Sequence, residues 1–299
     1  MGASCSSLPT PPRNSNAHSD PEHDGWRPPD PLSPAVMSAL HAAPTEDLLF
    51  AQPRTSAGCL FEGGVLTVRQ ACILELSLSQ AYRGRQWTRL FLLSQHGASL
   101  STLLRRTRGV APTLLCLRTD MGDTLGAFSP SPWWDAGAPL GAHLDMPPLA
   151  GPSTSFFGYG CGAFVFSFAE TEGAPRGKDC TPGYKKSAWS SDRASQLQFL
   201  RVEPSKNGGG VATAIGMGGG GESFALLLDE SLERGRSGRC LAFGSEGLAS
   251  SSQGVGGDAE VFRALEVECW GLATLGTVCC AVSEDALPAA NARSVAVSV

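Results

Sequence analysis

The chain has 299 residues, of which 42% are hydrophobic and 17% are charged, and its formal net charge is −5. This length suits one large domain with tails, and the negative charge argues against a nucleic-acid-binding protein. The 36 glycines and 21 prolines indicate many turns and few long helices. No apolar run approaches the roughly 20 residues of a membrane-spanning helix, and the nearest, residues 271–282, is too short.

The ten cysteines are spaced irregularly, and most lie inside apolar runs, as Cys72, Cys116 and Cys269 do. The N-terminal residues do not have the pattern of a secretory signal peptide. Buried, reduced thiols therefore fit the sequence better than a disulfide scaffold does. We expect a cytoplasmic protein.

The N-terminus carries a lipidation pattern. Gly2 and Ser6 fit the N-myristoylation motif, and Cys5 could accept the second acyl chain that stable membrane attachment requires. Residues 7–53 hold ten of the 21 prolines, and such a segment buries too little apolar surface to offset its ordering entropy. We expect residues 1–56 to be a disordered, Pro-rich tether, anchored through Gly2 and Cys5 to the cytosolic face of a membrane. A chance match in a Ser-rich tail is the alternative.

A domain is expected over residues 57–275. Apolar residues on one helical face predict a helix over 65–82, and a second helix is expected over 98–106. Short apolar or aromatic runs with turn residues between them predict strands at 87–93, 113–118, 124–128, 163–168, 224–228 and 265–272. The Ala-rich residues 276–299 are interpreted as a C-terminal tail.

Several motifs follow one another in this domain. The most specific is a glycine run, Gly218, Gly219, Gly220 and Gly221, followed by Phe224-Ala-Leu-Leu-Leu-Asp229-Glu230 and by Gly235-x-Ser237-x-x-Cys240. The others are Trp87-x-x-Leu-Phe before a His-Gly loop, Gly126-Ala-Phe128 before Ser131-Pro-Trp, and a closing Leu-Glu-Val-Glu-Cys-Trp270-Gly271. Over about residues 60–272, this order resembles the TLDc domain of the oxidation-resistance proteins.

The resemblance implies an α+β fold, a mostly antiparallel two-sheet β-sandwich with a few flanking helices. It also implies a non-enzymatic regulatory protein without a cofactor. Such a protein takes part in resistance to oxidative stress, or binds the peripheral subunits of the V-type proton pump, or does both. One family feature is missing, because the acid of the family's Gly-x-Gly-Glu motif is absent from residues 158–162.

The sequence offers few residues for catalysis or cofactor binding. Residues 216–221 match Gly-x-Gly-x-x-Gly, but a strand rather than a helix is expected after them, so a turn fits better than a dinucleotide site. The domain has only His96 and His143 and no metal-binding motif. We interpret His96 as a loop residue. Asp229 and Glu230 are adjacent, so they are expected to cap the following turn and not to share a proton.

An enzymatic alternative needs a reactive thiol at Cys161 or Cys240, and the sequence around Cys240 suits one. Arg236 and Arg239 lie close to it in the sequence, and neighbouring cations can lower a thiol pKa enough to make a reactive thiolate. A thiol-based antioxidant enzyme is therefore the first alternative function, whereas burial beside Leu241 and Phe243 would make the thiol structural. A lipid-anchored scaffold is the second alternative.

Between Glu75 and Asp120 the sequence has no acid but seven arginines: Arg83, Arg85, Arg89, Arg105, Arg106, Arg108 and Arg118. A cluster of positive charge raises the association rate with acidic partners. The alternative interpretation is that these arginines lie on a solvated helix face without a partner. We expect Arg105 and Arg106, on the helix opposite Leu103 and Leu104, to contact an acidic protein surface or an anionic membrane.

Overall fold

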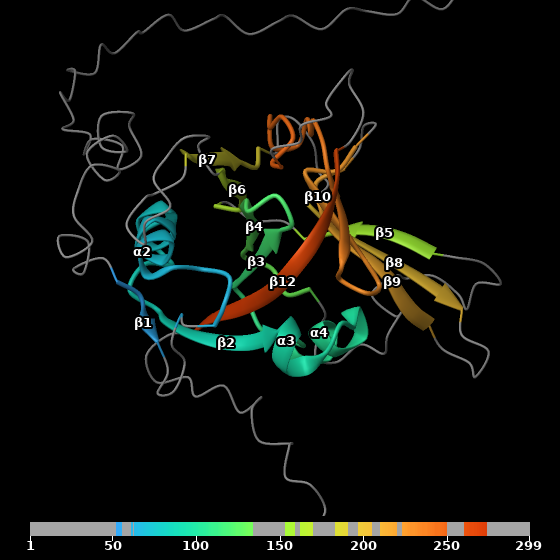
Figure 1. The fold of residues 1–299 in the computed structure, drawn as a ribbon, viewed down its shortest axis with the longest axis horizontal. Coiled ribbons are helices and arrows are strands. Elements are labelled where there is room, and N and C mark those ends of the chain that lie inside the picture. The colour runs from blue at the N-terminus through green and yellow to red at the C-terminus, as the bar shows by residue number, and fades with distance from the viewer. Residues whose placement is uncertain are drawn as a thin grey trace, which may run out of the picture.

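The computed structural model describes residues 52–55, 61, 63–133, 153–158, 162–169, 183–190, 197–204, 210–219, 223–249 and 260–273 (Figure 1). Its elements, in chain order, are β1 (Arg54–Thr55), α2 (Val68–Ser77), β2 (Gln86–Leu92), α3 (Leu93–His96), α4 (Leu100–Arg106), β3 (Thr113–Thr119), β4 (Thr124–Ser129), β5 (Ser153–Phe157), β6 (Phe164–Ala169), β7 (Gly183–Ala188), β8 (Gln198–Pro204), β9 (Gly210–Met217), β10 (Leu226–Asp229), β11 (Arg234–Ser237) and β12 (Glu260–Ala273).

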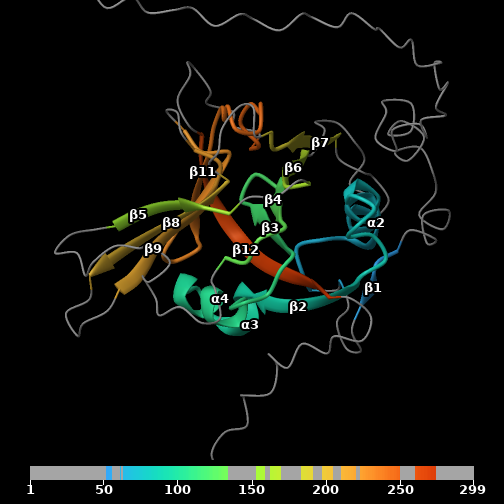
Figure 2. The same ribbon diagram turned by 180° about the vertical axis from the view of Figure 1, so that it is seen from behind.

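The long strand β12 organises the fold. Its first residues pair with β11, and its later residues pair with β3 on one side and β2 on the other. Sheet A therefore contains β1, β2, β3, β4, β6, β7 and the C-terminal half of β12. Sheet B contains β5, β8 to β11 and the N-terminal half of β12. β12 crosses the middle of the molecule, with β5, β8 and β9 projecting beyond one end (Figures 1 and 2).

Two apolar cores lie on opposite faces of sheet A. On β3, Leu115 and Leu117 point into the inner core, which they share with Ile215 and Met217 of sheet B. Leu114 and Cys116 of the same strand point into the outer core. Side chains alternate between the faces of a strand, so β3 is apolar on both faces because both faces are covered.

The outer core is covered by α2. Ile73 and Leu74 of this helix are fully buried, and they belong to one cluster with aromatic residues of sheet A. Phe61 is 5.1 Å from Trp270 and 6.3 Å from Trp87, measured between ring centroids. Burial of such large side chains dominates core energetics. The N-terminal part of the domain is therefore held onto sheet A by aromatic packing.

The predicted α+β sandwich is confirmed, with antiparallel pairing everywhere except between β1 and β2. The first helix is shorter than the predicted 65–82. It begins after Thr67, whose side chain forms a capping box with Gln70, and it ends before Leu78, which is extended. Tyr82 fits the apolar spacing of another helical turn, but it packs on Phe128 from a loop.

The second helix begins after Ser99, whose hydroxyl accepts the backbone N–H of Thr102 at 3.3 Å. Its buried residues are Leu100, Leu103 and Leu104, and they close one end of the inner core. Within the described part of the chain, no helix is long and apolar enough to cross a membrane. The lipidation residues Gly2 and Cys5, most of the predicted tether and the C-terminal tail lie outside the described residues.

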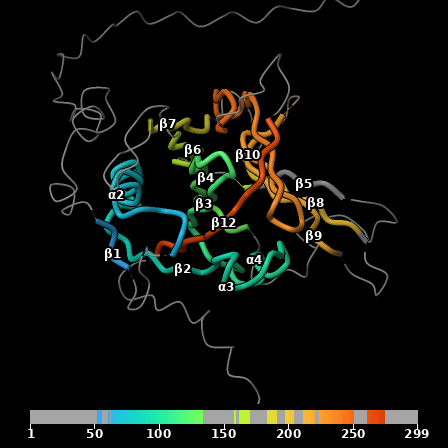
Figure 3. The backbone as a smooth tube through the Cα atoms, in the orientation of Figure 1, coloured from blue at the N-terminus to red at the C-terminus, as the bar shows by residue number. Residues whose placement is uncertain are grey.

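The chain path explains why β12 can join both sheets (Figure 3). Its pairing register with β3 shifts between Ala264 and Glu266, and its register with β2 shifts between Cys269 and Trp270. Such bulges re-aim side chains and increase local twist. The inner core therefore contains residues from both sides of the first shift: Phe262 and Ala264 before it, and Val267 and Cys269 after it.

Candidate functional site

The glycine run closes a hairpin. β9 and β10 pair antiparallel on either side of it, with Met217 opposite Leu226. Gly218 and Gly219 have φ angles of +73° and +154°, which favour glycine. A Cβ on Gly218 would lie 2.5 Å from the Cys240 sulfur. Because a strand follows, the interpretation of this run as a turn is confirmed. Gly220 and Gly221 lie outside the described residues.

The Asp229-Glu230 pair shapes the turn between β10 and β11. The Asp229 Oδ1 accepts hydrogen bonds from the Ser231 hydroxyl at 2.8 Å and from the Arg234 N–H at 3.4 Å. The Glu230 carbonyl accepts the backbone N–H of Leu100 at 2.9 Å and so caps α4. The expected capping role is confirmed for Asp229, and it extends to a contact with α4 that sequence reasoning missed.

Two motif glycines lie directly opposite phenylalanines. Gly126 of β4 pairs with Phe166 of β6, and Gly235 of β11 pairs with Phe262 of β12. A Cβ on either glycine would lie 2.2–2.3 Å from the ring of its partner. The phenylalanine rings therefore occupy the space above these glycines, and the two positions are structural.

The Gly-x-Ser-x-x-Cys segment holds a loop against β10. The Ser237 hydroxyl donates to the Ala225 carbonyl at 2.6 Å and accepts the Leu248 N–H at 2.7 Å. Cys240 and Ser245 exchange two backbone hydrogen bonds, at 2.8 and 3.2 Å. Ser237 is fully buried, so these bonds satisfy polar groups that water does not reach.

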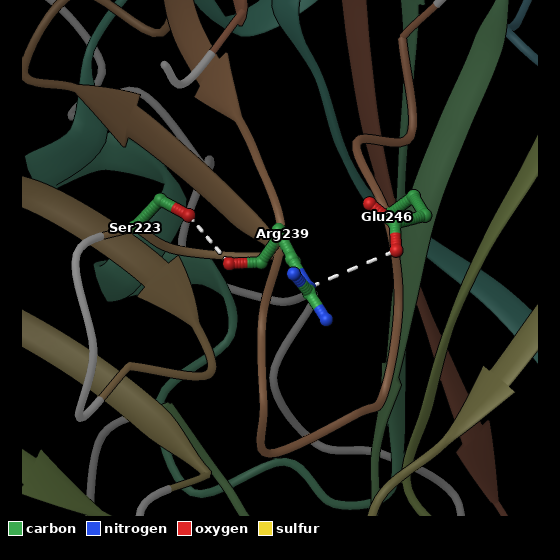
Figure 4. A network of polar contacts seen from close by, with 3 residues as sticks. All are labelled: Ser223, Arg239 and Glu246. Carbon is green, nitrogen blue, oxygen red and sulfur yellow. Dashed lines mark hydrogen bonds and ion pairs between the residues drawn. The ribbon is translucent and has the colours of Figure 1, made fainter. Parts of the chain in front are cut away.

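The Cys240 thiol is buried, with 1% of the residue exposed, and it packs in the inner core with Phe243. The Arg239 guanidinium points away from the core to the Glu246 carboxylate at 3.7 Å, and both of these side chains are more than 70% exposed (Figure 4). The Ser223 hydroxyl donates to the Arg239 carbonyl at 2.6 Å. Cys240 is therefore placed as a structural thiol, and the arginine beside it serves a surface ion pair.

The other described cysteines, Cys72, Cys116 and Cys269, are buried as well and form no disulfide. Burial raises the pKa of Cys72 to about 11. Burial, followed by the neighbouring Glu268 carboxylate, also raises the pKa values of Cys116 and Cys269. Since the thiolate is the nucleophile, these three thiols are poor candidates for reaction with peroxide.

Two buried carboxylates secure the outer core. Glu75 accepts the Trp87 indole N–H at 2.9 Å and the backbone N–H of Gly84. Glu268 accepts the Leu66 N–H at 3.0 Å. Burial raises the pKa of both carboxyls, although these hydrogen bonds oppose the shift. Both groups join the segment before β2 to sheet A, which is a structural role.

Two of the seven arginines between Glu75 and Asp120 have partners within the fold. Arg83 donates to the Leu78 carbonyl at 2.7 Å and also to the Leu76 carbonyl. Arg89 lies 5.6 Å from the Trp270 ring and near Glu268. The partners of Arg83 are local, whereas those of Arg89 come from β12, which is distant in the sequence.

Arg105 and Arg106 lie in the last turn of α4. Arg105 is exposed and Arg106 is half-buried, whereas Leu103 and Leu104 face the core. Cations in the last turn of a helix interact favourably with its dipole. The expected partner contact of Arg105 and Arg106 stays a prediction, and their position at the surface is compatible with it.

A second basic surface was not predicted. We define the arginine face as the exposed side chains of Arg234, Arg236, Val261, Arg263 and Leu265, on the outer side of β11 and β12. Arg234 is directly opposite Arg263, and Arg236 is opposite Val261. The alternating Arg-Gly-Arg-Ser sequence could have revealed β11 as a strand with one polar face.

No group of three or more metal-ligating side chains occurs among the described residues. His96 ends α3, and its Nδ1 accepts the Leu92 N–H at 2.9 Å. Its ring is 5.6 Å from that of Phe91. His96 is therefore the last residue of a short helix and not the loop residue that was predicted. Its ring nitrogen accepts the backbone N–H of the residue that precedes this helix.

Comparison with known proteins adds to this geometry. The family model of the TLDc domain matches residues 60–273. Oxidation resistance protein 1 of Homo sapiens is 28% identical over 188 residues, which are 62% of this chain and 16% of that protein. The protein of the same name from Rattus norvegicus is 27% identical over 62% of this chain and 17% of its own length.

Nuclear receptor coactivator 7 of Gallus gallus is 25% identical over 182 residues, or 60% of this chain and 15% of that protein. The matched region thus covers about a sixth of the length of these relatives. The likeness lies in the domain that contains β2 to β12.

Proposed function

Because the chain belongs to the TLDc family, we propose that it is a non-enzymatic regulatory protein that acts in resistance to oxidative stress. Two of the similar proteins described above are named for oxidation resistance. The family match covers β2 to β12 and leaves the N-terminal 59 residues, with β1, outside it.

One observation carries the non-enzymatic part of the proposal: the four described cysteines are buried. Cys161, the other candidate nucleophile, lies outside the described residues. A thiol that scavenges peroxide must be accessible and must form a thiolate readily. Cys240 fails the first requirement, and Cys72, Cys116 and Cys269 fail both. Binding through surface side chains is the activity that this arrangement supports best.

We propose that the bound partner is the peripheral sector of the V-type proton pump and that Arg105 and Arg106 contact it. The resemblance to the TLDc family implies the pump as partner, and the support for Arg105 and Arg106 is the way in which their helix is held. The two side chains lie on α4. Leu103 and Leu104 pack this helix against the inner core, and the Glu230 carbonyl caps its N-terminus. A rigid helix presents charge without a large ordering cost on binding.

Affinity capture tests this proposal. The full chain is immobilised, and purified peripheral pump subunits are applied at low and at raised salt. The double substitution Arg105→Glu with Arg106→Glu should lower the association rate at least about tenfold, because charge steering acts mainly on association. Cys240→Ser should leave capture unchanged.

A matched control reverses two other exposed cations, Lys185→Glu with Arg201→Glu, and changes the net charge equally. If this control loses capture to the same extent, the loss reflects net charge and the assignment of Arg105 and Arg106 is wrong. If the unaltered chain captures no pump subunit, the proposed partner is wrong.

We further propose that Gly2 and Cys5 are acylated and place the protein on the cytosolic face of a membrane. The sequence pattern is the support. In a cell with a myristoylating enzyme, Gly2→Ala should move the protein to the soluble fraction. Cys5→Ser should do so in part, because one acyl chain binds membranes only marginally. A wholly soluble unaltered protein would refute the proposal.

A further inference from the structure

The arginine face combines unpaired charge with exposed apolar surface. Val261 is 67% exposed and Leu265 is 51% exposed. Arg234, Arg236 and Arg263 have no ion-pair partner among the described residues. The buried residues of α2 and α4 belong to the two cores, and all five side chains of the arginine face are exposed. A ligand of this face must therefore supply negative charge and an apolar group.

The strand register makes the charge arrangement costly. Arg234 and Arg263 are a directly opposed pair on adjacent strands, and like charges in that position destabilise a sheet. Arg236 lies two residues along the same strand, on the same face. Carboxylates placed between these guanidinium groups would replace repulsion with charge-assisted hydrogen bonds.

We propose that residues 20–26 of this chain bind the arginine face. Asp20, Glu22 and Asp24 alternate with other residues, so an extended segment presents all three carboxylates on one side, roughly 6.6 Å apart. This is also the spacing of Arg234 and Arg236 along β11. Trp26 follows two residues later and supplies an apolar group for Val261 and Leu265.

The connecting chain has a suitable length. Arg54 of β1 pairs with Gln86, and Gln86 pairs with Ala273 at the end of β12. Arg263 lies ten residues back along β12, which is about 33 Å. Thirty residues separate Asp24 from Arg54. A Pro-rich chain extends by up to about 3.1 Å per residue, so this segment can span that distance. A segment that can reach its site within one chain binds there at a raised effective concentration.

Charge complementarity favours this occupant. Residues 1–53 contain six acids and only two arginines, whereas the arginine face contributes three positive charges. The bound segment occludes the face, so another acidic partner must displace it first. The face is thus self-masked, independently of any contact that Arg105 and Arg106 make.

Cross-linking of the full chain tests the contact. The variant Arg263→Lys keeps the positive charge but introduces an amine, which a carbodiimide couples to a carboxylate in direct contact. Mass spectrometry should find the new amine joined to Asp20, Glu22 or Asp24. The matched variant Arg105→Lys, on exposed α4, should give at least about tenfold less of this product. Raised salt should lower the yield from Arg263→Lys.

Two further variants decide the interpretation. Adding Asp20→Asn, Glu22→Gln and Asp24→Asn to the Arg263→Lys chain should remove the product. Mixing isotope-labelled and unlabelled chains should give products within one chain only. The proposal is overturned by no product at residues 20–24, by equal yields from the two lysine variants, or by products that join two chains. The last result would assign the face to a contact between copies.

Discussion

The outer side of β12 differs between its two ends. At the C-terminal end, Trp270 and Leu272 are buried under α2 and Phe61, and the carboxylate of Glu268 is buried with them. At the N-terminal end, Val261 and Leu265 are exposed between arginines. One strand thus belongs to a stability core at one end and carries the exposed arginine face at the other.

The largest expected effect is at the covered end. Trp270→Ala removes a fully buried side chain that packs on Trp87 at 6.0 Å and on Phe61 at 5.1 Å, between ring centroids. The free energy of unfolding should fall by about 3–5 kcal/mol, measured by urea denaturation. Leu265→Ser at the exposed end is the control and should change it by less than about 0.5 kcal/mol. Similar losses of unfolding free energy from the two substitutions would mean that the two ends of β12 do not differ in this way.

One glycine–phenylalanine pair, Gly126 with Phe166, lies in the covered region, and the other, Gly235 with Phe262, lies at the exposed end of β12. Substitution of either glycine should destabilise the domain to a similar extent. Gly126→Ala and Gly235→Ala each force a Cβ against a phenylalanine ring, which should cost about 1–3 kcal/mol of unfolding free energy. Gly183→Ala is the matched control, because a Cβ at that position would have nothing within 4 Å. Thermal unfolding of the three variants checks this; a cost at Gly183 equal to the others would contradict the packing argument.

The buried carboxylates should give the covered end a pH dependence. Burial raises the folded-state pKa values of Glu75 and Glu268 above their ordinary value of 4.5. Between the unfolded and folded pKa values the native state holds more protons, so the stability that these groups contribute is lost as pH rises. Glu268→Gln should flatten the decline in unfolding free energy above about pH 5. An unchanged slope would mean that this carboxyl does not titrate as described.

The smallest expected effect is at the exposed end. Arg234→Gln removes the opposed arginine pair and should stabilise the domain by about 0.2–1 kcal/mol at low salt, provided that Asp20, Glu22 and Asp24 have been changed to amides. With these acids intact the gain should be smaller, because the carboxylates already offset the repulsion. A double-mutant cycle by denaturation measures the difference, and equal gains in both backgrounds would argue against the contact.

The sequence predicted those elements well whose contacts join residues close together in the chain. The strands around residues 113–118 and 124–128 were expected within one residue of their ends, because an apolar hairpin with a Gly-containing turn is a short-range signal. Both predicted helices begin later in the structure, after the capping residues Thr67 and Ser99. Capping depends on backbone geometry that apolar periodicity alone does not report.

Distant partners were not predictable. Glu268 lies more than 170 residues from Arg89 in the sequence, yet the two are close in the fold. The lack of acids between Glu75 and Asp120 in the sequence therefore does not mean that the arginines of this interval lack acidic neighbours in the fold. The arginine face was missed because Arg234 and Arg263 become neighbours only through the pairing of β11 with β12.

The central claim is that this domain acts through its surface and not through its thiols. The most direct test measures survival under peroxide in cells that depend on this protein. Cys240→Ser should protect as well as the unaltered protein, because that thiol is buried. Arg105→Glu with Arg106→Glu should lose most of the protection at equal protein abundance. Loss of protection in the Cys240→Ser chain, together with full protection by the arginine variant, would contradict the claim.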